Sequence, residues 1–288
     1  MRLLLTSVEQ GLIFSILAMG VLMTFKILDT ADLSVEGTFP FGAFLFARFI
    51  SSGLNPILSS ILALCFGSLA GLLTTTLFTK LKIKPILAGI LTATILYSVN
   101  LKINGRSNIP LFSYGSIFDL GPTLLILIII VLIIKIALDL FLKTEMGYMV
   151  IATGDNEALV KSLGENITKY KLIGFMIANG LVALSGSLMS QHQGFVDITM
   201  GASIIVVALA SIIIGDTIMK ESNKLKITTR VIIGAIIYKI IGGIAIDLGL
   251  NPDDLRAINA FIVIAFIAYN NKTAGMFKSK DKGGVENA

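Results

Sequence analysis

Long apolar runs separated by short polar connections dominate the chain. A helix that crosses a bilayer needs about 20 mostly apolar residues, and several runs reach or approach that length. In order they cover 11–28, 36–50, 56–78, 84–98, 122–142, 171–189, 201–215, 231–248 and 255–270. The pattern predicts an all-α polytopic membrane protein with about eight to ten transmembrane helices.

Two of the runs are short and interrupted. Gly37 and Pro40 fall inside 36–50, and Pro85 and Gly89 fall inside 84–98. Irregular backbone at membrane depth is tolerated only where protein or water surrounds it. These runs are therefore expected to be broken helices or re-entrant pieces buried in the bundle. If 36–50 did not cross the membrane, the N-terminus would change sides.

Composition supports a membrane protein. The 288 residues are 55% hydrophobic and 14% charged, and the mean hydropathy is +0.89. A soluble domain of this composition would expose large apolar patches to water. No segment between the runs is long enough to bury a core of its own.

Basic residues are distributed unevenly among the connections. One side would hold the N-terminus and only Arg2, Lys102, Arg106 and Arg256. The other side would hold Lys80, Lys82, Lys84, Lys143, Lys161, Lys169, Lys171, Lys220, Lys224, Lys226, Arg230, Lys272, Lys278, Lys280 and Lys282. The richer side is predicted to be cytoplasmic, so nine crossings put the N-terminus outside and the C-terminus inside. This explains the positive net charge without a nucleic-acid partner.

A short pattern occurs twice. The first run leads to the acidic turn 32–37, and the sixth leads to the similar turn 197–201. The copies are five helices apart, an odd number, so they would have opposite orientations in the membrane. Inverted repeats of this kind build many transporters. Chance or shared helix-capping chemistry is the alternative explanation.

The cytoplasmic loop 143–169 contains a predicted short helix at 154–164. Asp155 is a suitable N-cap and Gly164 a natural C-terminal stop. Leu159 and Leu163 are four residues apart and share one face. A short exposed helix is not stable alone in water, so it should dock either on a partner or on this protein's own surface.

The same loop carries a family resemblance. The stretches 152–158 and 162–166, with Ala183–Gly186 and Gly194–Asp197, resemble permeases of branched-chain amino acid ABC importers. Leu28–Pro40 is most similar to a branch linked to aromatic amino acids such as tryptophan or tyrosine. The resemblance covers roughly residues 10–270. Two features depart from it: Gly215 is followed by Asp216 rather than glycine, and Gly164 falls one position late for the loop motif of other importer permeases.

The resemblance implies a permease domain over 1–272, with a coupling loop at 143–170 and a basic cytoplasmic tail at 273–288. It implies as partners a separate ATP-binding subunit, an extracellular solute-binding protein, a second permease copy and the lipid bilayer of a prokaryotic plasma membrane. The chain has no phosphate-binding Gly-x-x-x-x-Gly-Lys-Ser/Thr loop and is expected to bind no cofactor. Contact with the ATPase would be made by Gly154, Asp155, Asn156, Glu157, Ala158, Leu159, Leu163 and Gly164.

Ionisable residues within or beside the runs are candidates for the solute pathway. They are Asp32, Glu36, Asp197 and Lys239. An amino acid needs donors for its carboxylate and acceptors for its ammonium, and helix N-termini after Asp32 and Asp197 can supply donors. The alternative for the two aspartates and Glu36 is helix capping.

A secondary transporter driven by an ion gradient, using Lys239 and Asp139, is the competing hypothesis. Lys135 and Asp139 are spaced to pair on one helix face, and Asp139 and Lys143 repeat that spacing. No nucleophile–base arrangement or pair of catalytic carboxylates emerges, so the chain is expected to be a transport subunit and not an enzyme.

Overall fold

A computed structural model of the chain describes residues 2–219, 225–249, 261 and 264. Apart from one two-stranded antiparallel sheet, its regular elements are helical. The α-helices are α1 (Arg2–Leu22), α2 (Val35–Ser51), α3 (Pro56–Thr79), α4 (Pro85–Asn104), α5 (Thr123–Phe141), α6 (Glu145–Asp155), α7 (Glu157–Ser162), α8 (Ile167–Gln193), α9 (Ile204–Met219) and α10 (Ile227–Asp247). The short elements are the π-helix η1 (Met23–Ile27), the 3-10 helices η2 (Ile117–Leu120) and η3 (Ile198–Gly201), and the strands β1 (Asn108–Pro110) and β2 (Phe195–Asp197).

Seven helices within the described residues are long and apolar enough to cross a membrane. They are α1 with η1, α3, α4, α5, α8, α9 with η3, and α10. Helix α2 is continuous over 17 residues with Pro40 inside it, so the break expected within 36–50 is absent, whereas most of its residues are buried in the bundle as predicted. The predicted polytopic all-α fold is confirmed. Most of the ninth run, 255–270, and the basic tail 273–288 lie outside the described residues.

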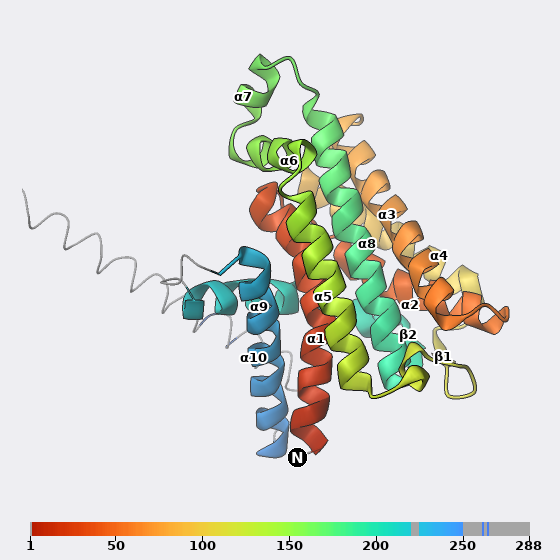
Figure 1. Cartoon of the computed structure of the whole chain (residues 1–288). Helices are drawn as coiled ribbons and strands as arrows, with labels where there is room; N and C mark the ends of the chain where they lie inside the picture. Colours follow the sequence, from red (N-terminus) through yellow and green to blue (C-terminus); the bar gives the residue numbers. More distant parts are fainter. Residues whose placement is uncertain (1, 220–224, 250–260, 262–263, 265–288) are drawn as a thin grey trace, which may run out of the picture.

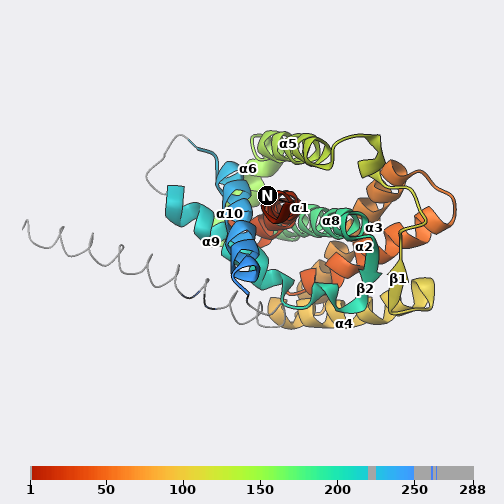
Figure 2. The same cartoon turned by 90° about the horizontal axis from the view of Figure 1, so that it is seen from below.

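Helices α1 and α8 form the centre of the bundle, and the other long helices surround them (Figure 2). They run in opposite directions, α1 up from the N-terminus and α8 down (Figure 1). The contacts along their length show the same antiparallel arrangement. Leu28 packs on Gly174, the Ser185 hydroxyl donates to the Ile13 carbonyl, and His192 pairs with Glu9. The opposite orientation predicted for the first and sixth helices is confirmed, whereas the repeat itself stays a prediction.

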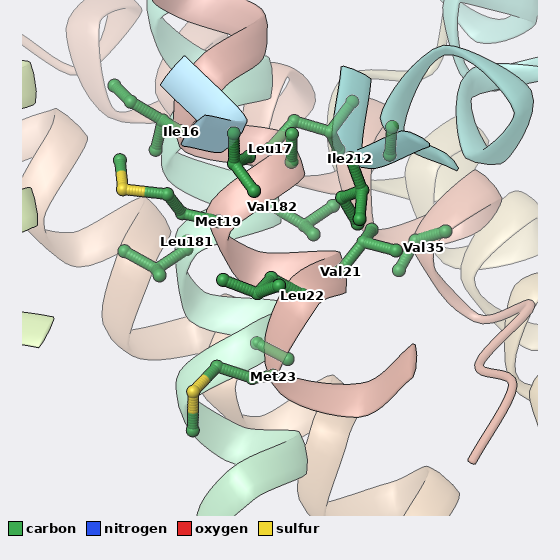
Figure 3. Close-up of a cluster of buried hydrophobic side chains, with 14 of the residues drawn as sticks. Ile16, Leu17, Met19, Val21, Leu22, Met23, Val35, Leu181, Val182 and Ile212 are labelled. Atoms are coloured by element: carbon green, nitrogen blue, oxygen red, sulfur yellow. The ribbon is translucent and has the colours of Figure 1, made fainter. Parts of the chain in front are cut away.

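The main hydrophobic core surrounds α1 (Figure 3). Ile16, Leu17 and Leu22 of α1 are fully buried and lie among side chains of α2, α8 and α9. Helix α5 is different because Ile129 and Ile133 on its outer face are exposed. In a bilayer such a face contacts lipid chains, so its exposure costs nothing there.

The expectation of a broken helix at 84–98 is wrong, because α4 is continuous over 20 residues. Pro85 occupies the first turn, where a helix needs no N–H from that residue. Gly89 lies on the face that packs against the backbone of Leu33. The glycine therefore allows close packing and does not break the helix.

A buried carboxylate ties α5 to α10 at one end of the bundle. Asp139 accepts hydrogen bonds from Lys135 at 2.8 Å, Lys226 at 3.0 Å and Thr228 at 2.6 Å. The predicted Lys135–Asp139 pair is confirmed, whereas no ion pair joins Asp139 to Lys143 among the described residues. Asp216, which departs from the family pattern, pairs with Lys26 and lies 3.8 Å from Arg230.

We expect Asp139→Asn to lower stability by about 1–3 kcal/mol, because it weakens three hydrogen bonds and leaves Lys135 without its counter-charge. Thermal unfolding of the purified protein in detergent measures this. Lys143→Gln is the control and should unfold at the wild-type temperature. Equal losses in both variants would contradict a specific role for the Asp139 cluster.

Candidate functional site

Two short helices project from one end of the bundle (Figure 1). Thr144 caps α6, since its hydroxyl oxygen accepts from the Gly147 N–H at 3.1 Å. The backbone is extended at Asn156, and the Asn156 side chain caps α7 by accepting from the Leu159 N–H at 3.1 Å. The predicted helix at 154–164 is therefore placed too early: Asp155 ends α6, and Asn156 is the N-cap.

Helix α7 shows an exposed apolar face. Leu159 is 52% exposed and Leu163 64% exposed, whereas Val160 between them is fully buried. An ion pair of 2.6 Å between Glu157 and Lys171 fastens α7 to α8. Gly164 ends the helix with φ +79°, as its position predicted. The helix is thus anchored by one side and offers Leu159 and Leu163 on the other.

The remaining predicted coupling residues differ in exposure. Asp155, Asn156, Glu157 and Ala158 are exposed, as contact with a partner requires. Gly154 instead faces η1, and a side chain there would overlap the Ile27 carbonyl oxygen. Gly154 is therefore needed for packing α6 on the end of α1.

A cavity of about 460 Å³ lies where the N-terminal ends of α2 and α9 approach α4. One face of α4 lines it, and its other walls come from the first turns of α2, from η3 and from the residues joined to them. The lining residues are Leu33, Glu36, Gly37, Pro40, Ile90, Ala93, Thr94, Tyr97, Asn100, Ile198, Thr199, Gly201 and Ala202. Such a volume suits a small organic molecule.

Glu36 is the acidic side chain that lines this cavity. Its carboxylate accepts a hydrogen bond from the backbone N–H of Ser203, just before α9. Gly201 approaches the Glu36 carbonyl so closely that a side chain there would overlap it. In a helix the N–H of residue 40 would bond to this carbonyl, but Pro40 has no N–H. The Glu36 carbonyl therefore lacks that helical hydrogen bond and faces the backbone at Gly201. The starts of α2 and α9 are thus held together around Glu36.

Asp32 is not one of the lining residues and lies in a buried polar cluster. It accepts hydrogen bonds from the Ser34 N–H at 2.9 Å and from the Asn179 amide at 2.8 Å. The Asn179 oxygen in turn accepts from Thr38 at 2.7 Å. Asp32 therefore fixes the start of α2 against the middle of α8.

The other two predicted pathway residues lie outside the cavity lining. Asp197 caps η3 by accepting from the Thr199 N–H at 2.8 Å, and it also accepts from the Asn108 amide at 3.1 Å. Burial alone would raise the pKa of Asp197, but the hydrogen bonds from Thr199 and Asn108 outweigh it and hold that pKa below its usual value. Lys239 of α10 places its ammonium 3.8 Å from the ring centre of Phe14.

Sequence reasoning missed two asparagines. Asn100 lines the cavity and Asn179 orients Asp32, but the pathway residues predicted from the sequence were all ionisable ones. Both are strongly polar residues in otherwise apolar helices, which is itself a signal of function in a membrane segment. On α4, residues 90, 93, 97 and 100 also follow helical spacing. The sequence could therefore have predicted that they share one face of the helix.

Comparisons with known proteins agree with this architecture. Residues 3–268 match the family described as branched-chain amino acid transport system, permease component. A tyrosine transport system permease protein of Clostridioides difficile is 44% identical, covering 97% of this chain and 95% of that protein. A ribose import permease of Bacillus subtilis is 29% identical over 90% of this chain and 79% of its own length.

One solved structure shares the fold. PsaBC from Streptococcus pneumoniae in complex with Fab superposes with a TM-score of 0.51 at 16% identity, covering 92% of this chain and 91% of that one. The family match spans nearly the whole chain, and the helical bundle accounts for its apolar runs. The chain belongs to the permease family of branched-chain amino acid transport systems and is a membrane-spanning permease subunit of an ABC-type importer.

Proposed function

We propose that this permease carries an amino acid, of aromatic type, through the cavity between α2, α4 and η3. The observation that carries the proposal is the position of Glu36 in that cavity, beside the starts of two helices. The tyrosine transport permease named above supports this choice of solute.

The cavity offers both kinds of group that a zwitterion requires. The Glu36 carboxylate attracts an ammonium, and the partial positive charge at the starts of α2 and α9 attracts a carboxylate. Apolar residues such as Ile90 and Ile198 line the cavity as well and suit an aromatic ring. In this proposal Asp32 and Asp197 act by positioning the helix starts, and Lys239 acts from outside the cavity, at the contact of α10 with α1.

Energy comes from a separate ATP-binding subunit seated on α7. The support is the exposed pair Leu159 and Leu163 on a helix that is anchored by its opposite side. The end of the bundle that bears α7 then faces the cytoplasm, as does the C-terminus, and the N-terminus is outside the plasma membrane. An extracellular binding protein delivers the solute, and two copies of the permease pair, as the resemblance implies.

The test is uptake of radiolabelled L-tyrosine into vesicles that contain the permease with its ATPase and binding protein. We expect accumulation that requires ATP and persists when an uncoupler removes the proton gradient. Accumulation that collapses with the uncoupler while ATP is held constant would instead support the secondary transporter. An absence of L-tyrosine uptake in vesicles that transport another solute would refute the proposed solute.

Replacing Glu36 by glutamine should lower L-tyrosine uptake at least about tenfold, because a charged hydrogen bond to the ammonium is lost. Asp29→Asn is the matched control, since Asp29 is an exposed carboxylate before α2 with φ +47°, a conformation that asparagine tolerates. The control should transport as the wild type does. Equal uptake by all three proteins would exclude Glu36 from solute binding.

A further inference from the structure

The π-helix η1 connects the end of α1 to the segment that leads to the cavity. Its widened turn is closed by the Leu28 N–H, which donates to the Met23 carbonyl at 3.0 Å. π-helical turns are rare and recur at functional sites. After η1 the chain reaches the start of α2, and with it Glu36, through the short segment 28–34. A displacement of η1 therefore acts directly on the start of α2.

Helix α6 packs on η1 in backbone contact. Gly154, near the end of α6, lies so close to the Ile27 carbonyl that a side chain there would overlap it. Leu28, just after η1, packs equally closely on Gly174 of α8. Close-packed interiors have low compressibility and transmit displacement. A partner that moves α6 and α7 would therefore also move η1.

An ion pair at the same end of the bundle ties η1 to α9. Lys26 of η1 pairs with Asp216, near the C-terminal end of α9, and both side chains are partly exposed. The opposite end of α9 follows Ser203, whose backbone N–H donates to the Glu36 carboxylate. Both walls of the cavity at Glu36 are thus connected to η1. The start of α2 is connected through the chain, and α9 is connected through the ion pair.

We propose that Lys26 and Asp216 are positioning residues that make the two walls of the cavity move together when the ATPase displaces α6 and α7. The inference rests on the proposed function and deepens it by assigning the connection between the ATPase contact and the solute cavity. Without the pair, η1 still displaces the start of α2, but α9 does not follow. Stability alone does not explain the pair, because partly exposed ion pairs contribute little to folding.

The test follows the reactivity of a cysteine in the cavity wall. Thr94 lines the cavity and is exposed, so Thr94→Cys in a Cys65→Ser background reports access to a water-soluble maleimide. This full-length parent protein is measured in nanodiscs with its ATPase, with and without a non-hydrolysable ATP analogue. We expect the analogue to change the labelling rate at least about fivefold, the lower end of typical coupling between sites. In Lys26→Gln this response should be lost, while the ATPase still co-purifies.

Three further variants separate coupling from folding. Lys26→Arg keeps the charge and should keep the response. Asp29→Asn, which neutralises an exposed carboxylate just after η1, is the matched control and should respond as the parent does. The unfolding temperature of Lys26→Gln should fall by no more than about 4 °C, because the pair is partly exposed. Asp216→Asn removes the other partner, should also lose the response, and serves if Lys26→Gln does not fold.

A response in Lys26→Gln equal to that of the parent would overturn the inference, since α9 would then follow η1 without the pair. A wild type that imports L-tyrosine with ATP, combined with a parent that shows no response, also overturns it. Loss of ATPase binding in both Lys26→Gln and Asp216→Asn would overturn it too, because the pair would then act in assembly. Failure of the wild type to bind the ATPase or to import any amino acid with ATP would instead refute the proposed function, so the two failures are distinguishable.

Discussion

A permease with Leu159→Asp or Leu163→Asp should insert normally into the membrane but should neither co-purify with its ATPase nor import solute. Both leucines are more than half exposed, Leu159 on α7 and Leu163 at its C-cap, and Asn156, Gly164 and the Glu157–Lys171 ion pair hold the helix in place without them. A charge at the centre of an apolar contact must be desolvated without a partner, which typically costs several kcal/mol. We expect the complex to weaken by at least about a hundredfold.

Co-purification through a tag on the ATPase measures assembly, and thermal unfolding of the permease alone measures folding. Thr168→Asp is the control, because Thr168 is exposed on the first turn of α8 and receives the same charge. That variant should assemble and transport normally. Val160→Asp should behave differently again and unfold α7, since Val160 is fully buried. Intact complexes in both leucine variants would contradict the proposal that the ATPase binds at α7.

Gly42→Ala should lower stability by about 2–4 kcal/mol and abolish uptake. Helix α2 crosses α8 in backbone contact at this point, and a Cβ on Gly42 would overlap the backbone of Ala183. Gly186 makes the reciprocal contact with the Phe39 carbonyl. Small residues allow such close helix packing in membranes, where van der Waals contact replaces the hydrophobic effect as the driving force. Because α2 carries Glu36, displacing it also deforms the cavity.

Gly242→Ala on α10 is the matched control, since a Cβ there meets nothing within 4 Å. Thermal unfolding and uptake should both match the wild type. If the two alanine variants unfold at the same temperature, the close approach of α2 to α8 is not what holds the bundle together.

Much of the architecture was readable from apolar runs alone. The runs that became α3, α5 and α8 were assigned correctly, because a bilayer imposes a length and a composition that hardly depend on neighbours. The prediction of Asp155 as the N-cap was wrong because Asp155 and Asn156 are both residue types that cap helix N-termini well. Only the extended backbone at Asn156 shows that Asn156 is the N-cap. Run 84–98 was misread because Pro85 and Gly89 each have a role compatible with a continuous helix.

The sequence by itself determined that the chain crosses a membrane many times and that residues near 154–164 form a short exposed helix. It also placed Asp32, Glu36 and Asp197 at helix starts. Only the tertiary structure decided that Glu36 and Asn100 line one cavity. It also decided that the Asp32 carboxylate is hydrogen-bonded to Ser34 and Asn179, and that the Lys239 ammonium lies over the ring of Phe14. The physical reason is that the spacing of polar and apolar residues along a helix indicates which face of that helix turns away from lipid. Which residues of other helices contact that face depends on how segments distant in the sequence cross each other.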